Sequence, residues 1–301
     1  MGVSRRDFFL GAASLALLPA WARAGAMSAG RMRFVHMTDL HIQPEMGAAE
    51  GVRMAVQAVL KLKPRPTFVL TGGDHVMDVL VSGRERADEQ FRLLDEALRP
   101  LEMPVIPTIG NHDVFGWGDK DVDAKDPLYG KRMFEERTGL PLSRGAYEFG
   151  GLKILEVDSI KPTGTGWKAE IGAEGLARLD KELAEPGPKV LFTHVPAVTT
   201  LQQTNVATTA AAPPGLVLAD GKELFDLTRK HPGVIAVLQG HTHVVEDVDY
   251  AGTRWITGGA VSGDWWKGPR LGIHPEGFTV FDWDGKTLER EYVAYGWKAR
   301  R

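Results

Sequence analysis

The chain has 301 residues, 43% of them hydrophobic and 25% charged, so it is long enough to bury the core of one large domain. Its formal net charge is -3 and it has no long basic run, which argues against extended nucleic-acid binding through a basic face. The absence of cysteine from the sequence excludes disulfides, thiolate metal ligands, a cysteine nucleophile and a lipid-modified cysteine.

The first 24 residues have the features of an export signal. Arg5 and Arg6 precede a mainly apolar run, and Ala22-Arg23-Ala24 has the small-x-small form of a cleavage site. The alternative is a transmembrane anchor, but the apolar run is too short for a comfortable span. Paired arginines resemble a twin-arginine signal. We therefore expect the twin-arginine export machinery as a partner, a periplasmic or otherwise exported product without a stable membrane anchor, a signal over 1–24 and a single domain over 25–301.

From residue 33 onward, β-branched runs alternate with amphipathic patterns. Helices are predicted from Glu50 to Leu62 and from Arg86 to Leu98, because apolar residues recur there at helical spacing. Strands are predicted before, between and after these helices, over 33–38, 67–71 and 103–109. Strand, helix, strand, helix, strand in this order favours right-handed crossovers and a largely parallel sheet.

The second half of the chain continues this alternation and then becomes β-rich. A strand pair is expected around Gly150-Gly151, and a hairpin around Asp284-Gly285. Further strands are expected over 190–193, 234–239 and 254–257, and helices over 174–183 and 220–230. Two long segments without such a pattern, 114–130 and 196–219, are expected as loops that shape a functional site.

Five of the predicted strands end directly before a side chain that can bind a metal ion. The segments are Asp39-Leu40-His41, Gly73-Asp74, Gly110-Asn111-His112-Asp113, His194 and Gly240-His241-Thr242-His243. Ligands gather beyond the carboxyl ends of strands in open α/β sheets, so these ends can converge on one site. Carboxylate, amide and imidazole ligands without sulfur favour Mn, Fe or Zn. Seven such ligands exceed the need of one ion, whereas two ions that share a carboxylate use them all.

These segments, in this order, resemble the signature of the calcineurin-like metallophosphoesterases over roughly residues 31–261. The resemblance implies a four-layer αββα sandwich with two mixed β-sheets and a binuclear metal site at the edge where the strands end. It implies three ligands to a first ion, three to a second and one bridging carboxylate, namely Asp39, His41 and His243; Asn111, His194 and His241; and Asp74. It also implies that His112 stabilises the phosphoryl oxygens or protonates the leaving group, helped by Asp113.

The function implied by the resemblance is hydrolysis of a small phosphoester by attack of a metal-bridging hydroxide. Purple acid phosphatases have a similar order of motifs, but their tyrosine ligand comes three positions after the bridging aspartate, where this chain has Met77. The arrangement is more similar to bacterial cyclic-nucleotide phosphodiesterases. We predict an exported phosphodiesterase with two divalent or trivalent metal ions. The alternatives are a phosphomonoesterase with the same site and a non-catalytic envelope protein that binds phosphate or metal.

Several residues near these motifs keep more than one interpretation. His75 follows Asp74 where many relatives carry an apolar residue, and the sequence does not show whether it faces the site. Trp265 and Trp266 either line a substrate pocket or fill a hydrophobic corner. His36 alternates within a predicted strand and is expected as a core or sheet residue. The natural substrate, the metal and the oligomeric state stay open at this level.

Overall fold

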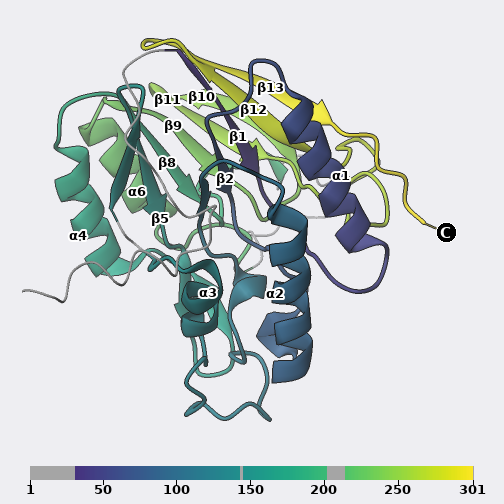
Figure 1. The fold of residues 1–301 in the computed structure, drawn as a ribbon. Helices are drawn as coiled ribbons and strands as arrows, with labels where there is room; N and C mark the ends of the chain where they lie inside the picture. The colour runs from purple at the N-terminus through teal and green to yellow at the C-terminus, as the bar shows by residue number, and fades with distance from the viewer. Residues whose placement is uncertain (1–30, 143–144, 202–213, 301) are drawn as a thin grey trace, which may run out of the picture.

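The computed structural model describes residues 31–142, 145–201 and 214–300 (Figure 1). The predicted export signal over 1–24 lies outside these residues, as does part of the predicted loop 196–219. Within the described ranges, no helix combines the length and the apolar character that a membrane span requires.

The first sheet has five strands in the order β13-β12-β1-β2-β3. Three of them run parallel, namely β1 (Met32–Met37), β2 (Phe68–Thr71) and β3 (Val105–Pro107). Strand β12 (Gly277–Trp283) adds antiparallel beside β1, and β13 (Leu288–Ala294) adds antiparallel beside β12. The crossovers between the parallel strands contain α1 (Ala48–Lys61) and α2 (Arg84–Leu98), as the sequence predicts. Strand β3 is shorter than predicted because Pro104 and Pro107 bound it.

The second sheet has six strands in the order β10-β11-β9-β8-β5-β4. Their bounds are β4 (Ala146–Phe149), β5 (Leu152–Val157), β8 (Lys189–Thr193), β9 (Val234–Gln239), β10 (Val245–Tyr250) and β11 (Thr253–Gly258). Strands β5, β8, β9 and β11 are parallel, and the two outer strands are antiparallel. Helices α4 (Gly172–Leu183) and α6 (Gly221–Lys230) lie on the side of the strands opposite to α1 and α2 (Figure 1).

The two sheets face each other across an apolar core, which explains the layered arrangement. Phe34 and Phe68 of the first sheet stack at 4.9 Å between ring centroids, and Phe68 stacks on Phe149 of the second sheet at 4.1 Å. The alternate residues of β1, Val35 and Met37, join a second core on the helix side. The predicted α/β sandwich with two mixed sheets is therefore confirmed.

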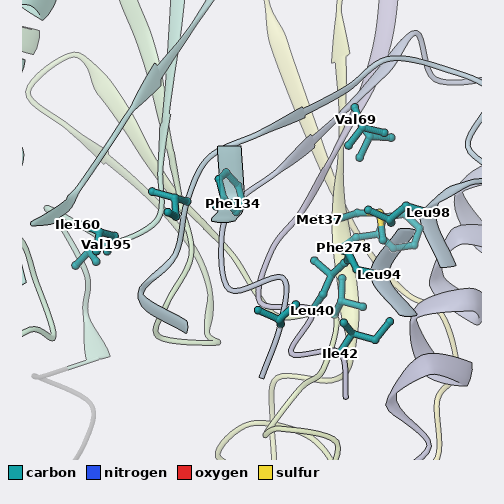
Figure 2. Close-up of a cluster of buried hydrophobic side chains, with 14 of the residues drawn as sticks. Met37, Leu40, Ile42, Val69, Leu94, Leu98, Phe134, Ile160, Val195 and Phe278 are labelled. Carbon is teal, nitrogen blue, oxygen red and sulfur yellow. The ribbon is translucent and has the colours of Figure 1, made fainter. Parts of the chain in front are cut away.

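Apolar side chains also anchor the segment that follows β1. Leu40 and Ile42 flank His41 and are fully buried beside Met37, Leu94 and Phe278 in the helix-side core (Figure 2). This burial holds the backbone on both sides of His41, so a polar residue is fixed between two apolar anchors.

Some short elements are visible only in the structure. They are α3 (Lys131–Thr138), the hairpin β6 (Ile160–Pro162) and β7 (Trp167–Ala169), and the 3-10 turns η2 (Val79–Val81) and η3 (Asn111–Asp113). Each is too short for a periodic apolar pattern to identify it. The predicted loop 114–130 leads directly into α3, and β6–β7 inserts between β5 and α4.

Candidate metal centre

The predicted ligands meet at the ends of parallel strands from both sheets. Asp39, Asp74 and Asn111 follow β1, β2 and β3 of the first sheet, while His194 and His241 follow β8 and β9 of the second. Backbone hydrogen bonds join the segment after β1 to the segment after β2. They run from Asp39 N to Gly73 O at 3.0 Å and from His41 N to Asp74 O at 2.9 Å. The ligand segments are thus tied to each other through the backbone as well as through side chains.

The backbone is strained where it presents these side chains. Five of the seven predicted ligands have left-handed φ angles between 43° and 70°, namely Asp39, His41, Asp74, His241 and His243. A non-glycine residue in a sparsely populated region of this kind costs about 1–3 kcal/mol, and such residues cluster at functional sites.

Asp39, His41 and His243 form the first group of ligands. Nε2 of His243 lies 3.2 Å from Oδ1 of Asp39 and 3.0 Å from Nε2 of His41. The other ring nitrogen of His243 donates to the carbonyl of Gly263, which leaves the Nε2 lone pair directed at Asp39 and His41. Nitrogen and carboxylate lone pairs that converge in this way repel one another unless a cation or a proton lies between them.

Asn111, His194 and His241 form the second group. Nδ1 of His194 donates to the carbonyl of Gly72 at 2.8 Å, so its Nε2 lone pair faces the site. This Nε2 lies 3.2 Å from Oδ1 of Asn111 and 3.2 Å from Nδ1 of His241. Side-chain oxygens and imidazole nitrogens therefore meet at a second point, and His194 and Asn111 are almost fully buried there.

Asp74 lies between the two groups. Its Oδ2 is 3.2 Å from Nε2 of His194 and 3.6 Å from Nε2 of His41. Burial alone lowers the pKa of His194, but the carboxylates of Asp74 and Asp39 outweigh it and raise that pKa to about 9. The field at this position therefore favours a positive charge, and the donor set fits metal ions that accept oxygen and nitrogen ligands.

The comparison with known families agrees with this geometry. The family model of the calcineurin-like phosphoesterases matches residues 32–245 of this chain. This range includes all seven predicted ligands. The chain belongs to this family of phosphoesterases. Metal-dependent phosphoesterase activity follows from that membership, since the family uses divalent metal ions.

The chain is also similar, in sequence or in fold, to individual proteins. A probable glycerophosphodiester phosphodiesterase of Arcobacter nitrofigilis is 28% identical over 226 residues, which cover 71% of this chain and 72% of the relative. A dimetal phosphatase from Danio rerio has the same fold, with a TM-score of 0.59, 15% identity and coverage of 88% of this chain and 99% of that chain. GAP50, the anchor in the inner membrane complex of Plasmodium, has a TM-score of 0.56, 12% identity and coverage of 88% and 85%.

His112 lies at the exposed edge of the phosphoesterase site, where its ring nitrogen comes within 4.8 Å of ligand atoms of His41 and Asp74. Its Nδ1 donates to the carbonyl of Met77, so its Nε2 faces the site, 4.0 Å from Oδ2 of Asp74. Its backbone N–H donates to Oδ1 of Asp74 at 2.9 Å. The His112 side chain is 27% exposed, whereas those of His41 and His194 are fully buried, so His112 is accessible to a substrate.

Asp113 is placed differently from the helper of His112 that the resemblance implies. Its carboxylate is fully buried and accepts hydrogen bonds from His75 and from backbone N–H groups. His75 therefore faces Asp113, which the sequence left open. Among the described residues, it is Met77, through its carbonyl, that holds the Nδ1 of His112. A backbone carbonyl has no residue signature, so sequence reasoning does not find this partner.

The two neighbouring tryptophans have different environments. Trp265 is partly exposed, and its ring centroid lies 4.4 Å from that of His243. Trp266 is fully buried, and its Nε1 donates to the carbonyl of His41 at 2.9 Å. The first thus lies at the metal centre, and the second fills a hydrophobic corner that supports a ligand segment. Trp167 of β7 approaches from another side, 5.7 Å from the ring of His241.

Proposed function

We propose that this chain is a binuclear metal-dependent phosphodiesterase that hydrolyses a small phosphoester. The observation that carries the proposal is the position of Asp74 between the two groups of predicted ligands, with the accessible ring of His112 beside it. Oδ2 of Asp74 lies 3.6 Å from Nε2 of His41 on one side and 3.2 Å from Nε2 of His194 on the other. Asp39, His41 and His243 would hold one ion, Asn111, His194 and His241 the other. The donor set suits Mn, Fe or Zn in the divalent or trivalent state.

Two bound ions supply Lewis acidity toward a phosphoryl group and toward water. The protein itself supplies the arrangement of the reacting groups. The buried imidazoles exclude bulk water from the ligand side, and His112 meets the substrate from the exposed side. Because Nδ1 of His112 donates to Met77, its Nε2 carries a proton only in the imidazolium form. In that form Nε2 either donates a hydrogen bond to a phosphoryl oxygen or gives its proton to the oxygen of the departing group, which leaves the neutral ring.

We propose a diester as the substrate rather than a monoester because the relative from Arcobacter nitrofigilis is named as a probable glycerophosphodiester phosphodiesterase. The runner-up is hydrolysis of a phosphomonoester at the same site, which the name of the Danio rerio phosphatase favours. Both reactions need the same ligands, so the preference between them depends on the residues around the entrance of the site.

The test is turnover of bis(p-nitrophenyl) phosphate beside p-nitrophenyl phosphate, using protein stripped of metal and reconstituted with Mn²⁺. We expect higher kcat/KM for the diester, and loss of turnover in Asn111→Ala, which removes a ligand of the second ion. A higher kcat/KM for the monoester would overturn the diester preference. Two bound ions without turnover of either ester would favour the non-catalytic binding protein instead.

We also propose that the chain is exported through the twin-arginine pathway, on the evidence of Arg5, Arg6 and the short apolar run that follows. The conservative double substitution Arg5→Lys with Arg6→Lys keeps the charge and should leave the product in the cytoplasm. Fractionation of bacterial cells that express each form measures this. Export of the double variant at the level of the wild type would contradict the proposal.

A further inference from the structure

A buried carboxylate joins the two turns that carry central residues of the site. Oδ1 of Asp113 accepts from the backbone N–H groups of His75 at 2.8 Å and Val76 at 3.2 Å. Oδ2 accepts from the N–H of Gly110 at 2.9 Å and from Nδ1 of His75 at 2.8 Å. Asp74 immediately precedes His75 in the turn after β2. The η3 turn after β3 contains Asn111 and His112. Asp113 thus connects the turn after β2 to the turn after β3.

The ring of His75 is held at both nitrogens. Because Nδ1 donates to Asp113, Nε2 of the neutral ring is an acceptor, and the hydroxyl of Thr71 donates to it at 2.8 Å. Thr71 is the last residue of β2. The side chains of His75 and Asp113 are 2% and 0% exposed, so water does not replace these bonds when they are lost.

We propose that His75 is a positioning residue of the metal centre, which fixes the turn that carries Asp74 against the turn that carries Asn111 and His112. The second connection between these turns depends on that placement, since Oδ1 of Asp74 accepts from the N–H of His112 at 2.9 Å. Without the His75 ring, Asp113 loses its side-chain partner and both turns can shift relative to each other. Groups that orient metal ligands from behind typically contribute roughly 10- to 100-fold to metal affinity or activity.

A cavity behind His75 makes chemical rescue possible. A cavity of about 560 Å³ is lined by Thr71 and His75 together with side chains of α2, β3 and α3. An imidazole molecule that enters this space can reach the volume vacated in a His75→Ala variant. Such a molecule restores a donor to Asp113 without restoring the covalent connection to the chain.

The experiment measures Mn²⁺ binding by titration calorimetry of metal-free protein, because this readout does not depend on turnover. His75→Leu should bind Mn²⁺ roughly 10- to 100-fold more weakly than the wild type. His75→Asn, whose amide can replace Nδ1, should recover most of the affinity. Added imidazole should strengthen binding by His75→Ala in a saturable way. The matched control is His231→Leu, which removes another histidine–aspartate pair, 2.6 Å from Asp180 and remote from the ligand turns.

Wild-type affinity in His75→Leu would overturn the proposal, as would equal losses in His75→Leu and His231→Leu. If His75→Leu does not fold, His75→Gln takes its place, because its longer amide reaches toward Thr71 instead of Asp113. Equal Mn²⁺ affinity of His75→Asn and His75→Gln would then overturn it.

The role of His75 in turnover rests on the proposed phosphodiesterase function. In fully Mn²⁺-loaded protein, His75→Leu should lower kcat more than it raises KM, because misplaced ligand turns affect the reacting groups more than substrate capture. A wild type that binds two ions without hydrolysing an ester would defeat the proposed function, while the calorimetric comparison would still decide the role of His75. An unchanged kcat in His75→Leu would confine its role to metal binding and overturn the link to turnover.

Discussion

His194, His243 and His112 differ in exposure, although in each of these three histidines a ring nitrogen donates to a backbone carbonyl. His194 and His243 donate to the carbonyls of Gly72 and Gly263, which directs their other nitrogens into the ligand groups. His112 donates to Met77 in the same way, but it remains partly exposed. A buried imidazole with a carbonyl behind it suits a metal ligand, whereas an exposed one suits contact with substrate.

We predict that His112→Asn lowers kcat by roughly 10²- to 10⁴-fold while two Mn²⁺ ions still bind, because His112 is not one of the seven proposed ligands. If His112 protonates the leaving group, the loss should be larger for an alkyl diester than for a p-nitrophenyl diester, whose leaving group needs no proton. Steady-state kinetics with both substrates measures this. Equal losses would assign His112 to stabilisation of the phosphoryl oxygens instead.

His36 gives a prediction about pH at the same scale. Its ring is buried between two glycines, and a Cβ at Gly72 would lie 2.4 Å from its Nε2. Burial lowers the pKa of His36 from 6.5 to about 4, although Asp39 opposes this effect. Between these pH values the unfolded chain binds a proton that the folded protein excludes. The stability linked to neutral His36 is therefore complete above pH 6.5 and is lost as the pH falls toward 4.

The matching variant is His36→Leu, which fills a similar volume without a titratable group. On going from about pH 7.5 to about pH 5, the wild type should lose stability that His36→Leu keeps. The difference in free energy of unfolding, variant minus wild type, should therefore increase by up to about 2 kcal/mol. Urea unfolding of the two metal-free proteins at both pH values measures this difference. Parallel pH profiles would show that His36 contributes nothing to acid sensitivity.

At the scale of elements, helix α1 and the segment after β11 together support the first ligand segment. Ser262 donates to the carbonyl of Asp39 through both its N–H and its hydroxyl, at 3.2 and 2.8 Å. Trp266 donates to His41, and its ring lies directly against Gly51 of α1. A Cβ at Gly51 would lie 2.1 Å from Cζ3 of Trp266. The absence of a side chain there lets the helix and the tryptophan approach each other.

Gly51→Ala should therefore destabilise the protein by about 1–3 kcal/mol, because overpacking forces the buried ring or the helix to move. Metal affinity should fall as well, since Trp266 contacts the segment that carries His41. Thermal unfolding and Mn²⁺ titration measure the two effects. Gly221→Ala in α6 is the control: its added Cβ would meet neighbours at 3.5 Å, so the higher helix propensity of alanine should leave stability unchanged or improved. Equal behaviour of both variants would refute the packing argument.

For the whole molecule, the metal centre connects the two sheets at their common edge. Its proposed ligands come from strands of both sheets, and buried carboxylates and imidazoles face one another there. Ions that bind only this folded arrangement must stabilise it, by RT ln(1 + [L]/Kd) for each site. Metal binding and unfolding of the sandwich are therefore coupled.

Removal of metal by a chelator should lower Tm, and Mn²⁺ at about a hundred times its Kd should restore about 2.7 kcal/mol for each ion. For a domain of this size, that corresponds to roughly 5–10 °C for each site. Scanning calorimetry of chelated and Mn²⁺-loaded protein measures the change, and Asn111→Ala should respond less than the wild type. An unchanged Tm after verified metal removal would contradict the coupling.

Much of the fold, and the set of candidate ligands that the structure brings together, was accessible from the sequence because both depend on local patterns. β-branched runs predicted strands, and the polar side chains after Met37, Thr71 and Thr193 marked where those strands end. The helices α1, α2 and α4 followed from apolar spacing, and α6 from Asp220 as an N-cap, each within two residues of its observed ends. Short elements such as α3 were not predicted, since eight residues contain too few apolar positions to define a period.

By itself, the sequence determined the alternation of strands and helices, the family, and the chemical types of side chain that can bind metal. Only the tertiary structure decided how those side chains are oriented, since the groups behind them are backbone carbonyls and distant residues. Gly263 is 20 positions from His243, and Asp113 is 38 positions from His75. Contacts over such separations depend on how the sheets pack and turn, and a local pattern of residue types does not encode them.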